Sequence, residues 1–203
     1  MSDLVYQIRK ATIERKTGET EITLSLDLDG AGKVHARTGV PFLDHMLDAL
    51  GRHGRFDIDV TCTGDADMDP HHTVEDVGIA LGQAIRQALH NKSGIARYGH
   101  AYAPLDEALS RVVIDCSGRP FLEYVAQMPE PAIGADFASS LVEEFWRALA
   151  MNGGLTCHID LLRARNSHHA AEAIFKAGAL ALRAATRLTG DPASIPSTKG
   201  ILA

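Results

Sequence analysis

The amino-acid sequence predicts an α+β fold built from two duplicated β-β-β-α-β-α units, each a sheet with helices packed on one face. The first observation is a repeated motif, because His71-His72-Thr73-Val74-Glu75 recurs as His168-His169-Ala170-Ala171-Glu172 and both open helix-forming apolar runs. The second is an earlier pair of runs with helical apolar spacing, Asp44–Leu50 and Glu143–Leu149. Short apolar matches also arise by chance, but several matches in the same order favour duplication.

Alternating strand patterns complete each unit. Phe56–Cys62 and Leu155–Leu161 alternate apolar and polar residues between the two helices, as half-buried strands do. Three more strands are expected before the first helix of each unit: Val5–Arg15, Glu21–Asp27 and Lys33–Arg37, then Tyr98–Ala103, Ser110–Asp115 and Pro120–Ala126. Asp29-Gly30 and Ser117-Gly118 are typical of hairpin turns. We expect units at residues 1–93 and 94–190, followed by a tail at 191–203.

Composition narrows the class of protein. The 203 residues carry a net charge of −6, with 45% hydrophobic and 23% charged residues, as in ordinary globular proteins. The negative charge argues against nucleic acid and anionic membranes as partners. Cys62, Cys116 and Cys157 form no C-x-x-C pair and are too few for a disulfide framework. Because no signal-peptide core or membrane-length apolar run is present, we expect a cytoplasmic protein.

The repeated H-H-x-x-E motif predicts a metal centre. Residues three and four apart share one face of a helix, so Glu75 can act with either histidine before it. Adjacent histidines point about 100° apart around a helix, so each motif is suited to two metals, one for each imidazole. Imidazole and carboxylate donors without thiolate suit Mn, Fe, Co, Ni or Zn in a catalytic site. A single pair of histidines would more simply lie at a surface or a helix cap, but two pairs with the same glutamate spacing favour metal. His45 and its repeat partner Glu144 each add a possible ligand.

Several longer motifs surround these residues. They are Arg15-x-Thr17-x-Glu19-Thr20, Gly39-x-Pro41-Phe42-Leu43-Asp44-His45-Met46-Leu47, Asp69-Pro70-His71-His72-Thr73-x-Glu75-Asp76, Asp106-Glu107-Ala108, Ser117-Gly118-Arg119-Pro120, Asn166-Ser167-His168-His169-x-x-Glu172-Ala173 and Pro196-Ser197-Thr198-Lys199-Gly200. Through them the chain, from about Ile8 onward, closely resembles the imidazoleglycerol-phosphate dehydratase family of histidine biosynthesis. The resemblance implies a ribosomal protein S5 domain 2-like arrangement of the duplicated units, in agreement with the strand and helix patterns.

The resemblance also implies a site and an assembly. Family members bind two Mn²⁺ per active site and form a 24-subunit shell from trimers, with active sites between subunits. The implied metal ligands are His45, His71, His72, Glu75, His168, His169 and Glu172. The implied residues for a small phosphorylated imidazole substrate are Glu19, Arg97, Arg119, Ser197 and Lys199, which makes 191–203 a substrate-contacting tail. Glu19 and the five histidines are the implied catalytic residues.

The chain departs from the family pattern in two places. Glu144 stands where the family commonly has a histidine ligand, and it is either a ligand itself or a charge on the helix surface. Its neighbour Glu143 is the alternative carboxylate if the alignment shifts by one residue. Ala49 stands where the family commonly has glutamine.

The implied reaction is loss of water from imidazoleglycerol phosphate to give imidazoleacetol phosphate. The hydroxyl is a poor leaving group, and Lewis acids on the imidazole ring would favour an imidazolate that can expel it. Glu19 is the candidate for proton transfer, and Arg97, Arg119 and Lys199 are candidates to bind the phosphate. Two rivals remain open: a dinuclear metallohydrolase such as a phosphatase, and a metal-storage or metal-linked shell protein without catalysis.

Overall fold

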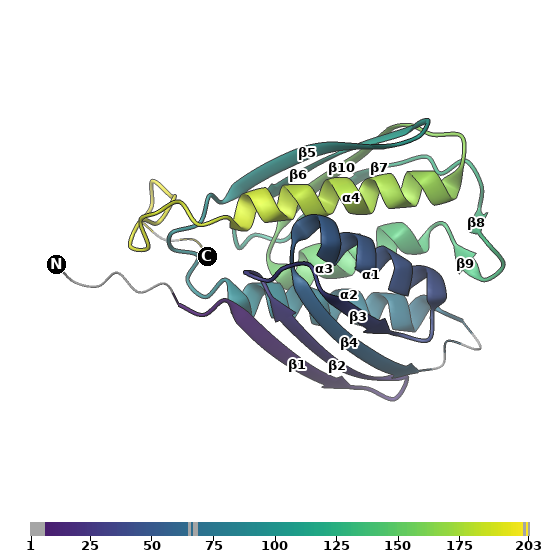
Figure 1. Ribbon diagram of the computed structural model, residues 1–203, viewed down its shortest axis with the longest axis horizontal. Helices are drawn as coiled ribbons and strands as arrows, with labels where there is room; N and C mark the ends of the chain where they lie inside the picture. Colours follow the sequence, from purple (N-terminus) through teal and green to yellow (C-terminus); the bar gives the residue numbers. More distant parts are fainter. Residues whose placement is uncertain (1–6, 65, 67–68, 201, 203) are drawn as a thin grey trace.

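Both halves of the chain contain the expected order of elements. The computed structural model describes residues 7–64, 66, 69–200 and 202, and it is drawn in Figure 1. The first half comprises β1 (Lys10–Lys16), β2 (Thr20–Asp27), β3 (Val34–Arg37), α1 (Pro41–Gly54), β4 (Asp57–Gly64) and α2 (His71–Ala88). The second comprises β5 (Tyr98–Leu105), β6 (Ala108–Asp115), β7 (Phe121–Val125), α3 (Leu141–Gly153), β10 (Thr156–Arg163) and α4 (Ser167–Thr186), plus a short unexpected hairpin of β8 (Ala132–Ile133) and β9 (Phe137–Ala138).

The ends of these elements lie within a few residues of the expected boundaries, except that β1 begins at Lys10, and residues 7–9, expected in that strand, lie outside it. The boundary expected between residues 93 and 94 falls in the connection between α2 and β5. Val5 and Tyr6, which the sequence assigned to the first strand, lie outside the described residues, as do 201 and 203 of the tail. The α+β fold with two duplicated units is confirmed.

Each half forms a four-stranded sheet with the same topology. The strand orders are β1-β2-β4-β3 and β5-β6-β10-β7. In the first sheet β2 pairs antiparallel with both β1 and β4, whereas β3 pairs parallel with β4. In the second sheet β7 likewise pairs parallel with β10. The last strand of each unit therefore lies between the second and the third.

This topology corrects the expected hairpin at Asp29-Gly30. The strands on either side of it, β2 and β3, are not neighbours, because β4 lies between them. The connection instead wraps around Asp57 at the start of β4, whose Oδ1 accepts hydrogen bonds from the backbone N–H groups of residues 31, 32 and 33 at 2.8–2.9 Å. A Cβ at position 30 would lie 2.5 Å from Asp57 Cγ, so glycine is required there by close approach.

The hairpin turn expected at Ser117-Gly118 is also wrong, for the same reason. This segment joins β6 to β7 across the beginning of β10, which lies between them. Gly118 has a φ of 83° and donates its N–H to the Gly154 carbonyl at 2.9 Å, while the Ser117 hydroxyl contacts that of Thr156 at 3.1 Å. Within the two four-stranded sheets, the hairpins are β1–β2 and β5–β6, whose turns are residues 17–19 and 106–107.

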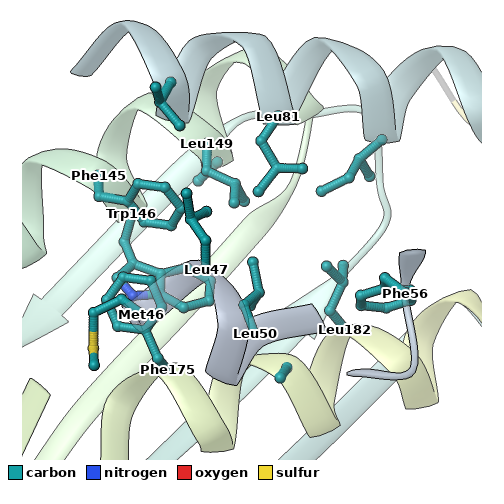
Figure 2. Packing of buried hydrophobic residues seen from close by; sticks show 14 of the residues in the cluster. Met46, Leu47, Leu50, Phe56, Leu81, Phe145, Trp146, Leu149, Phe175 and Leu182 are labelled. Atoms are coloured by element: carbon teal, nitrogen blue, oxygen red, sulfur yellow. The ribbon is translucent and has the colours of Figure 1, made fainter. Parts of the chain in front are cut away.

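Helices α1 to α4 form a layer between the two four-stranded sheets, as Figure 1 shows. Helices α1 and α2 contact the first sheet, α3 and α4 contact the second, and the halves meet through α2 against α3 and α1 against α4. One continuous hydrophobic core joins the halves. Its centre, drawn in Figure 2, contains Trp146 from α3 and Phe175 from α4, with ring centroids 5.4 Å apart.

Cys116 and Cys157 lie in this core, and burial raises the pKa of each thiol to about 12. Among the described helices, none combines the length and apolar character needed to cross a membrane.

Candidate metal and substrate site

Helices α1, α2, α3 and α4 begin at the same end of the molecule, as Figure 1 shows. His71 is the first residue of α2, and its N–H donates to Asp69 Oδ1 at 2.9 Å. His168 and His169 follow Ser167, the first residue of α4, and the Asn166 side chain caps that helix by accepting from the N–H of His169 at 3.0 Å. Both histidine pairs therefore lie in the first turn of a helix, at the same end of the helical layer.

The second motif is joined by a histidine from the first half. His45 on α1, His168 and Glu172 place one ligand atom each within 4.8 Å of one another. Glu172 Oε2 lies 3.2 Å from His45 Nε2 and 3.4 Å from His168 Nε2. Burial alone would raise the pKa of the Glu172 carboxyl, but Lys176, 2.7 Å away, and His45 together hold that pKa below its usual range.

The first motif is joined by a carboxylate from the second half. His71, Glu75 and Glu144 on α3 also place one ligand atom each within 4.8 Å of one another. Glu143 contacts Arg147 one turn further along α3, so Glu144, rather than its neighbour, faces the motif. Each motif thus has a partner from the opposite half. The role of Glu144 as a ligand stays a prediction. Ala49, the other departure, is buried in α1, one turn after His45.

The second histidine of each pair points elsewhere. The ring planes of His71 and His72 are 90° apart, and those of His168 and His169 are 85° apart. Within the described part of the chain, neither His72 nor His169 belongs to a group of three metal-binding side chains. The two imidazoles of each pair therefore face different directions, and the binding of one metal by each of them stays a prediction.

The hairpin turns of the two sheets bring carboxylates to these second histidines. Glu19, in the β1–β2 turn, places Oε1 3.6 Å from His72 Nε2. The turn is anchored on α2 through Asp76, which contacts the Thr20 hydroxyl and lies 2.8 Å from Arg15 Nη2. The sequence indicated the role of Glu19 only through the family resemblance.

Glu107, in the β5–β6 turn, is a contact to which the sequence gave no role. Its Oε2 lies 2.8 Å from His169 Nδ1. This hydrogen bond lowers the pKa of the Glu107 carboxyl to about 2, and the carboxylate in turn raises the pKa of His169. The only available signal was its place in the Asp106-Glu107-Ala108 stretch.

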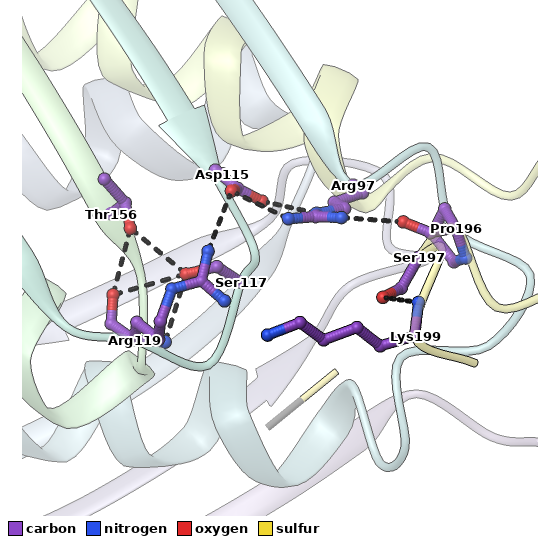
Figure 3. Close-up of polar contacts among 8 residues, drawn as sticks. All are labelled: Arg97, Asp115, Ser117, Arg119, Thr156, Pro196, Ser197 and Lys199. Atoms are coloured by element: carbon purple, nitrogen blue, oxygen red, sulfur yellow. Dashed lines mark hydrogen bonds and ion pairs between the residues drawn. The ribbon is translucent and has the colours of Figure 1, made fainter. Parts of the chain in front are cut away.

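The phosphate-binding candidates come together at the opposite end of the fold. Arg97 forms a bidentate pair with Asp115 at 2.8 and 3.2 Å, and its Nη1 donates to the Pro196 carbonyl at 2.8 Å. The hydrogen bond and charge of Asp115 raise the pKa of the Arg97 guanidinium. Figure 3 shows Lys199 extending from the tail toward Arg119, whose Nη2 lies 4.0 Å from Asp115.

Asp115 therefore contacts two of the cations, and its role was not indicated by the sequence. The Arg119 side chain is 65% exposed and its guanidinium can still bind an anion, whereas that of Arg97 is 13% exposed and already paired. The Ser197 hydroxyl accepts from the Lys199 N–H at 3.2 Å, which orders this part of the tail. The structure thus groups the four basic and hydroxyl residues, but not with Glu19, which lies beside the histidines.

Comparison with known proteins decides the family. The family model for imidazoleglycerol-phosphate dehydratase matches residues 38–182. The chain belongs to the imidazoleglycerol-phosphate dehydratase family. It is 55% identical over 195 residues to the enzyme of that name from Ralstonia nicotianae, covering 96% of this chain and 99% of that one. It is 56% identical over 196 residues to that of Aromatoleum aromaticum, covering 96% and 100%.

Solved structures of the dehydratase family share the fold. The Staphylococcus aureus enzyme matches with a TM-score of 0.81 and 40% identity, covering 89% of this chain and 99% of that chain. The Pyrococcus furiosus enzyme matches with a TM-score of 0.81 and 36% identity, covering 94% and 100%. The chain is therefore a dehydratase of histidine biosynthesis, a hydro-lyase. The comparisons do not support the alternative of a dinuclear phosphatase.

Proposed function

We propose that this chain converts D-erythro-imidazoleglycerol phosphate to imidazoleacetol phosphate with the help of two Mn²⁺ per active site. One observation carries the proposal: each H-H-x-x-E motif meets a donor from the opposite half to form a compact three-donor group. Family membership supports the substrate, and the grouping of Arg97, Arg119 and Lys199 supports binding of its phosphate.

The donor chemistry fits a divalent transition ion. Two imidazoles with one carboxylate, or one imidazole with two carboxylates, suit Mn²⁺ and similar ions. The side chains of His45 and His168 are 47% and 44% exposed, so this group is open to ions and substrate. Bound divalent ions would act as Lewis acids that lower the N–H pKa of the substrate ring and favour its imidazolate form.

The chain's own residues then have separate tasks. Arg119 and Lys199 would bind the phosphate oxygens. Arg97 pairs with Asp115 and donates to the Pro196 carbonyl, so it would hold the tail beside the phosphate. Glu19 is 55% exposed and lies beside His72, so it can reach a bound substrate. It would take the proton from the carbon next to the one that loses the hydroxyl. General acid–base catalysis of this kind contributes about 10²–10⁴-fold.

The location of these groups supports an active site shared between copies of the chain. The helix N-termini and the tail lie at opposite ends of the fold in Figure 1. A substrate with one imidazole and one phosphate is far too short to reach both ends of one copy. We therefore propose a site in which one subunit supplies the metal-binding end and another supplies the phosphate-binding end, within the 24-subunit shell of trimers expected in the cytoplasm.

Mixing two inactive variants tests the shared site. Glu19→Gln damages the metal-binding end, and Arg119→Ala damages the phosphate-binding end. In mixed assemblies with random placement, about one quarter of the sites would draw both intact residues from the two different chains. Co-expressed, differently tagged variants should therefore recover about one quarter of the parental activity. A site contained within one chain gives no recovery above the separate variants and would refute the proposal.

The reaction itself is tested by its products. Dehydration yields a ketone phosphate without release of inorganic phosphate, whereas a phosphatase releases phosphate in proportion to substrate consumed. An N-methylated substrate analogue cannot form the imidazolate, so we expect no turnover of it. Normal turnover of that analogue, or activity that survives removal of divalent ions, would contradict the metal-assisted reaction. A chain that bound ions without any turnover would instead be the storage protein considered from the sequence.

A further inference from the structure

The duplicated halves present two carboxylates at equivalent places, and their surroundings differ. Glu19 lies in the turn between β1 and β2, and Glu107 lies in the turn between β5 and β6. Each faces the second histidine of the motif in its own half, His72 or His169. The two carboxylates approach different nitrogens: Glu19 is near Nε2 of His72, and Glu107 is near Nδ1 of His169.

Glu107 is held in place by both of its oxygens. Oε2 is 2.8 Å from His169 Nδ1, and Oε1 accepts the backbone N–H of Arg165 at 3.2 Å. Its side chain is 20% exposed, against 55% for Glu19. Asp106, beside it in the two-residue turn, has a φ of 46°, so the backbone here takes a left-handed conformation. Arg165 belongs to the segment just before α4, so Glu107 fixes both the histidine and the approach to its helix.

We propose that Glu107 is a positioning residue that selects the tautomer and direction of His169. A carboxylate can only accept, so it keeps the proton on Nδ1 and leaves the Nε2 lone pair facing outward. A neutral histidine coordinates a metal ion through such a lone pair, and a carboxylate on its other nitrogen orients the ring and raises its basicity. This inference rests on the proposed function, because it assumes that His169 binds one of the two Mn²⁺.

The same reasoning separates the two halves of the duplication. Among the residues that the structure describes, the Glu19 carboxylate has no second anchor comparable to Arg165, and it lies on the Nε2 side of its histidine, where a bound ion and substrate would be. Glu107 lies on the far side of its histidine, away from Nε2. One copy of the turn carboxylate therefore acts on substrate, and the other orients a ligand.

Glu107→Gln is the most informative variant. Its amide oxygen can still accept from the Arg165 N–H, so the turn keeps its backbone contact. The amide NH₂ group then faces Nδ1 and donates to it, which places the ring proton on Nε2, the nitrogen needed for the metal. Loss of such an orienting partner typically weakens metal affinity by about 10–100-fold. Glu107→Asp keeps an acceptor on a shorter side chain, and we expect it to retain more affinity than Glu107→Gln.

The measurement is a titration of the metal-stripped full-length protein with Mn²⁺ alone, with free Mn²⁺ followed by electron paramagnetic resonance. We expect wild type to bind two ions per subunit, and Glu107→Gln to bind one of them about 10–100-fold more weakly. Glu123→Gln, at an exposed glutamate on β7, is the matched control and should titrate as wild type does. Circular dichroism and assembly mass should be unchanged in all variants.

Each other outcome has a definite meaning. If wild type binds two ions and Glu107→Gln binds both with unchanged affinity, the positioning role is wrong while the proposed function stands. The inference also fails if each of the two variants, Glu107→Gln and Glu107→Asp, lowers the affinity for the first and the second Mn²⁺ by the same factor. It fails too if the affinity falls only when assembly is lost, because Glu107 then acts on folding. If wild type binds no Mn²⁺, the proposed function itself fails.

Discussion

Gly178 on α4 lies directly against the Trp146 indole, and its replacement by alanine should destabilise the fold. A Cβ at this position would lie 2.2 Å from Cη2 and 2.5 Å from Cζ2 of Trp146. Carbon atoms in good contact are about 3.5–4.0 Å apart, so the indole would have to move by about 1.3 Å or more. Trp146 is fully buried against Phe145 and Phe175, at centroid distances of 5.9 and 5.4 Å, so these rings block such a movement of the indole.

The expected cost follows from this geometry. Overpacking a well-packed core costs about 1–3 kcal/mol, and we expect the upper part of that range, about 2–3 kcal/mol, because the obstacle is a rigid ring. For a chain of this size each kcal/mol lowers Tm by about 2–4 °C, so Gly178→Ala should melt about 4–12 °C lower. Gly18→Ala is the matched control, because a Cβ there meets no atom within 4 Å, and its effect should stay within about 0.5 kcal/mol.

A double variant isolates the contact. Trp146→Phe removes the part of the indole nearest to position 178, so its cost and that of Gly178→Ala should not add. We expect a favourable coupling of about 0.5–3 kcal/mol in the double-mutant cycle, measured by urea or thermal unfolding at one protein concentration. Additive effects, or a Gly178→Ala variant that melts within about 1 °C of the parent, would refute the packing argument.

Three further outcomes can be measured on the same protein. Glu144→Ala should weaken or abolish binding of one Mn²⁺ in a titration, whereas Glu143→Ala should not, and equal effects would contradict the placement of Glu144 in the three-donor group. The backbone hydrogen bond from Lys33, followed by those from residues 31 and 32, lowers the pKa of Asp57 below 3.8. The contribution of the Asp57 carboxylate to stability is therefore complete above about pH 4 and is lost as the pH falls through the lowered pKa. The gap in unfolding free energy between wild type and Asp57→Asn should therefore narrow below that pH, and a gap independent of pH would rule out the charge as its cause. Deleting residues 196–203 removes the carbonyl that accepts from Arg97 together with Lys199, so KM should rise strongly, and an unchanged KM would show that the tail does not bind substrate.

The order of strands and helices could be predicted because it depends on local patterns. Alternation in Phe56–Cys62 and helical spacing in Asp44–Leu50 indicate which face of each element is buried, and the fold packs these apolar faces together. The turns were harder. Asp29-Gly30 has hairpin composition, yet its glycine is needed for close contact with Asp57 on a strand much later in the chain. A local pattern cannot reveal that a later strand inserts between two earlier ones.

The candidate metal ligands could be named from the sequence, but their grouping could not, and neither Glu107 nor Asp115 was given a role. The spacing of His168 and Glu172 places them on one helical face, and this pairing is present in the structure. That His45 joins them, while Glu144 joins His71, results from the packing of α1 on α4 and of α2 on α3. Nothing in the spacing of the sequence encodes that exchange.

The exchange of partners between the halves bears on how a duplicated chain of this kind arose. A protein of half the length would carry one histidine pair and one position equivalent to residue 45 or 144, and these would lie on helices whose main helix–helix packing here is with the other half. Only a self-associated pair of such half-length proteins would assemble three donors. Gene fusion would then have made that pairing permanent and allowed the two positions to change independently, as they differ in this chain between His45 and Glu144.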